Sequence, residues 1–151
     1  MNTTTNQSFL VVEDSDEDFF AFERIVKKLS LTQAIYRCSD GDEALDFLYH
    51  RGQYIDPEKS PRPSIILLDL NLPGIDGRDI LAQIKQDSNL NMIPVVVFTT
   101  SSNPKDVEIC YQQGANSYII KPINVNKLMR SIQLLIEYWF EANTLAEFVN
   151  K

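Results

Sequence analysis

The sequence lacks the features that mark several classes of protein. Its 151 residues include 14 Lys and Arg against 21 Asp and Glu, so the net charge is −7, and no basic run is available to bind nucleic acid. No apolar stretch approaches the roughly 20 residues of a membrane span, and the start MNTTTNQS lacks the basic residues and the apolar block of a signal peptide. We therefore expect a cytoplasmic protein that binds neither nucleic acid nor membrane.

Cysteine is also scarce. Cys38 and Cys110 lie far apart, without further ligands at the spacing of a zinc site, so we expect two reduced thiols. A chain of this length has room for one domain with a core of its own. We predict a flexible N-terminus at 1–7, the domain at 8–137 and a helical extension at 138–151.

Strand-like apolar runs alternate with amphipathic segments five times along the chain. The predicted strands lie at 9–13, 34–39, 65–68, 93–100 and 116–120. The predicted helices lie at 16–30, around 44–48, at 77–88, at 104–114 and at 124–149. The third run does not alternate, which is typical of a strand covered on both faces. The pattern predicts a doubly wound α/β domain with a five-stranded parallel sheet and an extended C-terminal helix.

Polar side chains follow the predicted strands at their carboxyl ends, where ligands gather in open parallel sheets. They are Glu13 and Asp14, Asp69, Thr99 and Thr100, and Lys121. Three carboxylates at close range repel one another by about 4 kcal/mol per pair at an effective dielectric near 20, so a cation has to hold them. Mg²⁺ fits, because it takes oxygen ligands and combines one or two carboxylates with phosphate. A carboxylate beside Mg²⁺, an ammonium and a hydroxyl is what an aspartyl-phosphate site requires.

These residues resemble the response-regulator receiver domain of two-component signalling over almost the whole chain. The motifs that carry the resemblance are the acidic pair Glu13 and Asp14, the block DLNLPGIDG that begins at Asp69, FTT with Thr99, and SYIIKP with Tyr118 and Lys121. The resemblance implies the flavodoxin-like strand order 2-1-3-4-5. It also implies a signalling domain rather than an enzyme, one that assists its own phosphorylation and dephosphorylation.

The resemblance assigns a role to each matching residue. Asp69 would be the phosphoacceptor, with Thr99, Lys121 and Tyr118 as the switch residues. Mg²⁺ would be bound by Asp69 and Asp14 together with the backbone carbonyl of Asn71, while Glu13 would act mainly through water. The phosphoryl donor would be a histidine kinase.

Two longer segments carry a narrower resemblance, to the single-domain response regulators of cyanobacterial phytochromes. They are the loop YHRGQYIDPEKSPRPS at 49–64 and the tail LIEYWFEANTLAEF at 135–148. This resemblance implies a phytochrome as the kinase. With no room for an output domain, we expect the signal to pass to a downstream protein target.

The tail also carries more apolar residues than one stripe against a sheet needs. A second buried face follows, and a symmetric homodimer through the last helix is its simplest source. The predicted dimer contacts are Leu135, Tyr138, Trp139 and Phe140.

Two other classes of function compete with this interpretation. A phosphatase of the haloacid dehalogenase type also uses an aspartyl nucleophile, but it needs a second Asp two residues on, where Asn71 stands. A degenerate receiver would act as an unphosphorylated binding module, yet its usual sign, a missing acceptor, metal-binding acid or lysine, is not found. His50, the only histidine, ends an ordinary helix, and we expect no chemical role for it.

Overall fold

The computed structural model describes residues 7–146 and has the predicted parallel sheet. The strands are β1 (Ser8–Val12), β2 (Ala34–Cys38), β3 (Ile65–Leu68), β4 (Val95–Thr99) and β5 (Ser117–Ile120). They form one sheet in the order β2-β1-β3-β4-β5, with every neighbouring pair parallel. This is the expected order 2-1-3-4-5, so the predicted fold class is confirmed.

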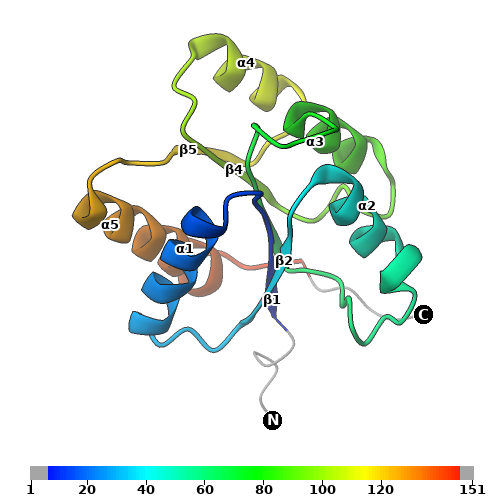
Figure 1. The fold of residues 1–151 in the computed structure, drawn as a ribbon, viewed down its shortest axis with the longest axis horizontal. Coiled ribbons are helices and arrows are strands. Elements are labelled where there is room, and N and C mark those ends of the chain that lie inside the picture. Colours follow the sequence, from blue (N-terminus) through cyan, green and yellow to red (C-terminus); the bar gives the residue numbers. More distant parts are fainter. Residues whose placement is uncertain (1–6, 147–151) are drawn as a thin grey trace.

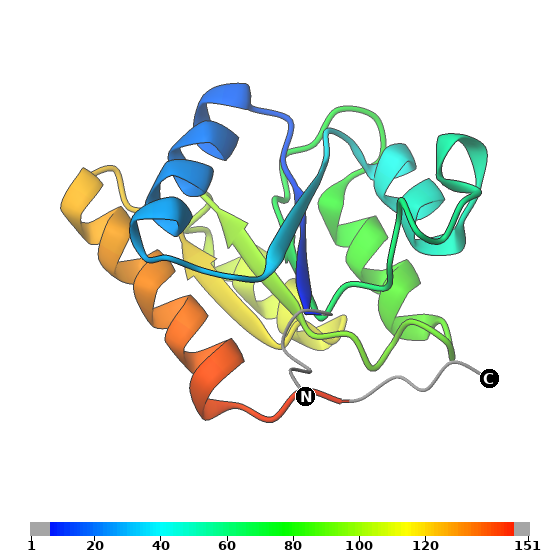
Figure 2. The same cartoon turned by 90° about the horizontal axis from the view of Figure 1, so that it is seen from below.

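Helices cover both faces of the sheet. They are α1 (Asp16–Lys28), α2 (Gly41–Tyr49), α3 (Gly77–Gln86), α4 (Pro104–Gln112) and α5 (Val125–Ile136). Helices α1 and α5 lie on one face, and α2, α3 and α4 lie on the other (Figures 1 and 2). Each face has its own apolar core, because alternate residues of the central strands point to opposite sides. Within the described range, no helix is long and apolar enough to cross a membrane.

The helices begin where a short polar side chain can cap them. Ser15, Asp40, Asp76, Asn103 and Asn124 each accept a hydrogen bond from a backbone N–H in the first turn of the following helix. Such a cap satisfies a donor that the helix itself leaves unpaired and typically contributes about 1 kcal/mol. Some of the polar residues that follow the strands therefore cap helices, while others do not act as caps and are available to bind a ligand.

The last helix is shorter than predicted. Helix α5 ends at Ile136, a wider π-helical segment follows at Glu137–Ala142, and Asn143 is extended. The Asn143 N–H donates to the Tyr138 carbonyl at 2.7 Å, which closes the wide turn. The predicted helix to residue 149 is thus wrong from residue 143 to residue 146, and its end lies outside the described residues. The wide turn brings apolar side chains into the core. Trp139 is buried there, and the Phe140 ring packs edge-on against Phe9, with 4.9 Å between the ring centroids.

This packing changes the expectation for the tail. Leu135 is 4% exposed and Trp139 is 8% exposed within their own domain, so both side chains pack mainly against their own core. The second buried face that we inferred from the surplus of apolar residues is thus partly the domain's own core. Tyr138, by contrast, is 53% exposed.

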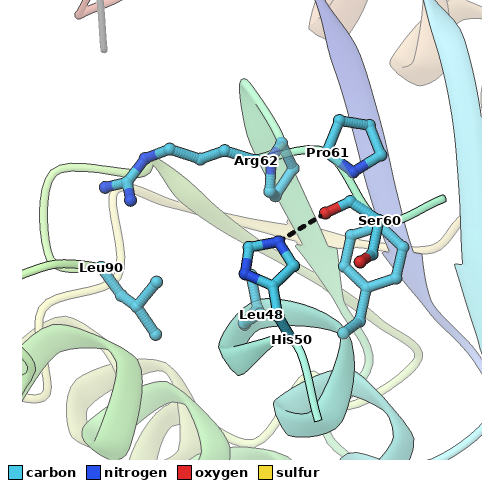
Figure 3. Close-up of a pocket in the computed structure, with 8 residues that line it drawn as sticks. Leu48, His50, Ser60, Pro61, Arg62 and Leu90 are labelled. Carbon is cyan, nitrogen blue, oxygen red and sulfur yellow. Dashed lines mark hydrogen bonds between the residues drawn. The ribbon is translucent and has the colours of Figure 1, made fainter. Parts of the chain in front are cut away.

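The loop between α2 and β3 is held against the domain. His50 ends α2 in the left-handed backbone conformation. Its Nε2 lies 2.9 Å from the Ser60 carbonyl oxygen, and Figure 3 shows the ring pointing at that carbonyl. Arg62 reaches the other way and donates to the carbonyl of Asn89, after α3. The pocket enclosed here measures about 30 Å³, which is the room of one water molecule. The contact with Ser60 gives His50 a structural role in holding the loop.

Candidate functional site

The three predicted acidic residues meet at the carboxyl ends of β1 and β3. These strands are neighbours, with Val12 opposite Leu68, so the next residues, Glu13 and Asp69, come side by side. The Asp69 N–H donates to the Val12 carbonyl at 3.1 Å, which continues the strand pairing up to the site. Each of Glu13, Asp14 and Asp69 offers a carboxylate oxygen within 4.8 Å of the others. Glu13 and Asp69 are buried, whereas Asp14 is exposed and leaves the cluster open to solvent.

Lys121 brings a positive charge to this cluster from the end of β5. Its Nζ donates to Glu13 Oε1, to Asp69 Oδ2 at 3.2 Å and to Asp18 Oδ2 at 3.1 Å. Its side chain is only 8% exposed. The Lys121 N–H donates to the Thr99 carbonyl at 2.7 Å, so pairing with β4 fixes the start of the side chain. All three ammonium donors are therefore used by carboxylates, two of them in the buried cluster.

Burial and charge shift the pKa values of this group. Burial raises the pKa of Glu13 to about 7, because desolvation outweighs the hydrogen bond and the charge of Lys121, and Asp69 adds to the rise. Burial alone would lower the pKa of Lys121, but the hydrogen bond to Glu13 and the charge of Asp69 raise it above its ordinary value. The lysine is therefore charged at neutral pH. The cluster remains short of positive charge, which is a reason for it to bind a cation.

The donor set fits a small divalent cation. Carboxylate oxygens are the ligands that Mg²⁺ prefers, and a partly open site lets it keep some of its water. Among the described residues, Glu13, Asp14 and Asp69 form the only group of acidic, His or Cys side chains close enough to share an ion. Asn71 lies beside them, since its N–H donates to Asp69 Oδ1 at 3.3 Å. That its carbonyl completes the metal site stays a prediction.

A glycine lets the loop after β3 return close to Asp69. The Gly77 N–H donates to the Leu70 carbonyl at 3.2 Å at the start of α3. A Cβ at this position would lie 2.4 Å from the Asp69 carbonyl oxygen and 2.7 Å from Leu70 Cα. The G of DLNLPGIDG that starts α3 is therefore required by the close approach of helix and loop, and it helps to hold Asp69 in place.

The two switch residues are linked through a residue that the sequence did not single out. Thr99 is fully buried at the end of β4, one residue beyond the position opposite Asp69. Its Oγ1 accepts from the Ser101 N–H at 3.3 Å, and the Tyr118 hydroxyl donates to the Ser101 carbonyl at 2.8 Å. Burial raises the pKa of Tyr118, so its hydroxyl stays protonated. The Ser101 Oγ also donates to Asp106 in α4 at 2.6 Å.

Asp18 is the other residue near the site that sequence reasoning missed. It lies in the first turn of α1, where acidic residues are expected on account of the helix dipole alone. Nothing in the sequence set it apart from Asp16 and Glu17 of the same helical turn. Only the path of α1 past the end of β5 brings it to Lys121.

Comparison with known proteins agrees with this geometry. A profile of the response regulator receiver domain matches residues 9–133. The chain is 43% identical over 136 residues to response regulator Rcp1 of Synechocystis sp., an alignment that covers 90% of each chain. It is 38% identical over 135 residues to the probable methanogenesis regulatory protein FilR2 of Methanothrix harundinacea, covering 89% of this chain and 84% of that one.

Solved structures extend the comparison to the fold. The Mn²⁺-bound form of Rcp1 matches with a TM-score of 0.86 and 41% sequence identity, and the phosphorylated cyanobacterial phytochrome response regulator RcpA matches with a TM-score of 0.87 and 35% identity. Both matches cover 93% of this chain and 99% of the other chain. Response regulator RPA3017, in red light signalling of R. palustris, matches with a TM-score of 0.88 and 31% identity. The acidic cluster, the lysine and the parallel sheet thus agree with the sequence matches, and the chain belongs to the response regulator receiver domain family, a family of signalling domains.

Proposed function

We propose that Asp69 accepts a phosphoryl group from a histidine kinase and that the chain acts as a response regulator in a phosphorelay. The observation that carries the proposal is the contact between the Asp69 carboxylate and Lys121 inside the acidic cluster. One Asp69 oxygen would attack the phosphorus of a phosphohistidine. As the new P–O bond forms, the P–N bond breaks, and the histidine nitrogen leaves with its electron pair.

Mg²⁺ would be held by Asp14 and Asp69 together with the carbonyl of Asn71, and Glu13 would act mainly through water. When bound, it would supply positive charge that offsets the negative charge of the carboxylates and of the phosphoryl group. The donor set supports this assignment, as does the Mn²⁺-bound form of the relative Rcp1. Lys121 would keep its place and donate to a phosphoryl oxygen instead of to Asp69 Oδ2.

The phosphoryl group would act as a switch through Thr99 and Lys121. It brings about 1.5 to 2 negative charges and three acceptor oxygens. Charge-assisted hydrogen bonds of about 1.5 to 3 kcal/mol each, made by these two residues, approach the roughly 5.5 kcal/mol that turns a 1:99 equilibrium into 99:1. Thr99 would move toward the phosphate and Tyr118 would follow, which changes the surface formed by α4, β5 and α5.

The kinase partner that we propose is a phytochrome. Support comes from RcpA, whose structure is described as that of a cyanobacterial phytochrome response regulator, and from RPA3017, described in red light signalling. The changed surface would then be recognised by a downstream protein. Mixing the chain with phosphorylated candidate kinases and following loss of label from the kinase would identify the donor.

We also propose a homodimer through the outer side of the last helix. Leu134 is 47% exposed and Tyr138 is 53% exposed, and they lie about one turn apart across the end of α5. Phe140, the other predicted contact, is partly buried against the core. Sedimentation at micromolar concentration, with Tyr138→Glu as the variant, tests the proposal. A monomeric wild-type protein would contradict it.

The phosphorylation site is tested directly by intact mass. The protein is incubated with Mg²⁺ and acetyl phosphate, and one added phosphoryl group is expected on the wild type. Asp69→Asn should gain none, while Asp79→Asn, an exposed carboxylate in the first turn of α3, should behave as the wild type does. Omitting Mg²⁺ should suppress the gain. Absence of any gain despite bound metal would favour an unphosphorylated binding module instead.

A further inference from the structure

Arg37, on the edge strand β2, contacts the segment that carries the acidic pair in three ways. Its Nε donates to the Glu13 carbonyl oxygen at 3.1 Å, and its Nη1 pairs with Asp16 Oδ1 at 2.7 Å. Its guanidinium carbon lies 4.9 Å from the centre of the Phe19 ring in α1. The side chain is only 18% exposed. One side chain thus connects β2, the end of β1 and the start of α1.

These contacts hold the backbone of Glu13 from both sides. The Glu13 N–H donates to the Cys38 carbonyl at 3.0 Å, and the Glu13 carbonyl accepts from Arg37. That carbonyl belongs to the peptide unit that joins Glu13 to Asp14. Because a peptide unit is planar, fixing its oxygen fixes the direction in which the chain enters Asp14.

The Asp14 carboxylate depends on the fixed backbone more than the Glu13 carboxylate does. The Glu13 carboxylate is held by Lys121 and accepts from the Ser15 N–H at 3.2 Å. None of the described residues donates a hydrogen bond or forms an ion pair with the Asp14 carboxylate, which is exposed. No side-chain contact holds it, so the backbone, which sets the direction of its Cα–Cβ bond, is the support that the structure offers.

We propose that Arg37 is a positioning residue for the divalent-metal site. It fixes the peptide unit before Asp14, so that the Asp14 carboxylate faces Glu13 and Asp69 before the cation arrives. Groups behind a metal ligand commonly act in this way, and their loss costs about 10- to 100-fold in metal affinity. This inference rests on the proposed function, since it names a residue that supports the same metal site.

The charge of Arg37 makes the inference easy to test. A guanidinium repels a cation, so the electrostatic effect of removing it would be tighter metal binding. If Arg37 instead positions Asp14, removing it should weaken metal binding. The ion pair with Asp16 already offsets part of the positive charge, which allows an arginine to lie this close to a cation site.

The experiment measures the affinity for Mn²⁺ alone by titration calorimetry. The variants are Arg37→Met, which removes the charge and keeps the stem over Phe19, and Arg37→Lys, which keeps the charge and loses the planar fork. Arg51 is the matched control, because it pairs with Asp46 at 3.5 Å and lies 4.9 Å from the centre of the Tyr49 ring, away from the site. The same two substitutions are made there. Near-UV circular dichroism sets a temperature at which every variant is folded.

We expect the Kd for Mn²⁺ to rise about tenfold in both Arg37 variants and to stay within twofold of wild type in both Arg51 variants. Unchanged or tighter binding in Arg37→Met would overturn the positioning role. A comparable loss in the Arg51 variants would also overturn it, since the effect would then be a general loss of stability. Failure of the wild type itself to bind Mn²⁺ would instead count against the metal site of the proposed function.

Discussion

The Tyr118 hydroxyl donates a hydrogen bond to the backbone carbonyl of Ser101, 2.8 Å away. The N–H of the same residue donates to Thr99 Oγ1 at 3.3 Å. The two proposed switch residues are therefore attached to opposite sides of one residue. If the Thr99 hydroxyl turns toward a phosphoryl oxygen, it gives up the contact with Ser101 and frees that segment to release Tyr118.

Replacing Tyr118 by Phe removes this attachment and keeps the ring. A typical intramolecular hydrogen bond contributes about 0.5 to 1.5 kcal/mol, so the free energy of unfolding in urea should fall by about that amount. Because the bond holds the unphosphorylated conformation, beryllium fluoride, a phosphoryl mimic, should bind more tightly. Tyr111→Phe, at an exposed ring of α4, is the control and should change neither quantity. Weaker binding of the mimic would show that the bond belongs to the activated state.

Thr99→Ala should leave Asp69 able to accept phosphate but weaken the response. The hydroxyl is the part of Thr99 that would donate to the phosphoryl group, whereas the nucleophile is untouched. We expect near-normal phosphorylation by acetyl phosphate, and a reduced chemical-shift change at Tyr118 on phosphorylation, measured by NMR. Thr99→Ser keeps the hydroxyl and should retain the larger change. Equal chemical-shift changes in the Ala and Ser variants would show that the Thr99 hydroxyl takes no part in the switch.

Glu13 should make the metal-free protein less stable as pH rises. Burial raises its pKa from 4.5 to about 7 in the folded protein, so the folded state holds this proton more tightly than the unfolded chain does. The resulting stabilisation is complete below pH 4.5 and is lost as pH rises through about 7. Relative to Glu13→Gln, we expect the wild type to lose up to about 3 kcal/mol across that window.

Mg²⁺ should reduce this loss, because a bound cation favours the ionised carboxylate. The measurement is urea unfolding at several pH values, with and without Mg²⁺, on the wild type and on Glu13→Gln. Parallel curves for the two proteins would show that the pKa of Glu13 does not differ between the folded and unfolded states.

Gly77→Ala should destabilise the protein and disturb the site. The added methyl group would meet backbone atoms of Asp69 and Leu70 within 2.7 Å, and backbone cannot move aside as a flexible side chain does. Overpacking of this kind costs about 1 to 3 kcal/mol. Gly74→Ala is the comparison, since its space is open and only its positive φ of 75° opposes the change. The Gly77 variant should also lose Mn²⁺ affinity, and the Gly74 variant should not.

Two adjacent aromatic residues of the tail should behave differently. Trp139 lies in the core of its own domain, so Trp139→Ala should cost about 3 to 5 kcal/mol of unfolding free energy. Tyr138 is half exposed and its ring packs edge-on against Trp139, so Tyr138→Ala should lower monomer stability by only about 0.5 to 1.5 kcal/mol. Its effect should appear instead in the dimer constant measured by sedimentation. An intact dimer in the Tyr138 variant would show that Tyr138 is not part of the dimer contact.

Much of this protein could be predicted from local features of the chain. The apolar run Ile65–Leu68 predicted a strand covered on both faces, because only a buried strand can be apolar on both sides. The polar residues after the strands predicted a shared site, because parallel strands bring their carboxyl ends to one edge. The acidic cluster and its lysine follow from these two patterns, and both are found in the fold.

Tertiary structure decided what depends on segments far apart in sequence. The tail looked like an unbroken helix with a surplus of apolar residues, but contact between Phe140 and Phe9 draws it into a wide turn and buries Trp139. Arg37 and Asp18 carried no signal of their own, since each is an ordinary residue of a strand or a helix. Their contacts arise only because β2 and α1 pass beside the acidic cluster, and a sequence pattern records spacing along the chain, not the path of the chain through space.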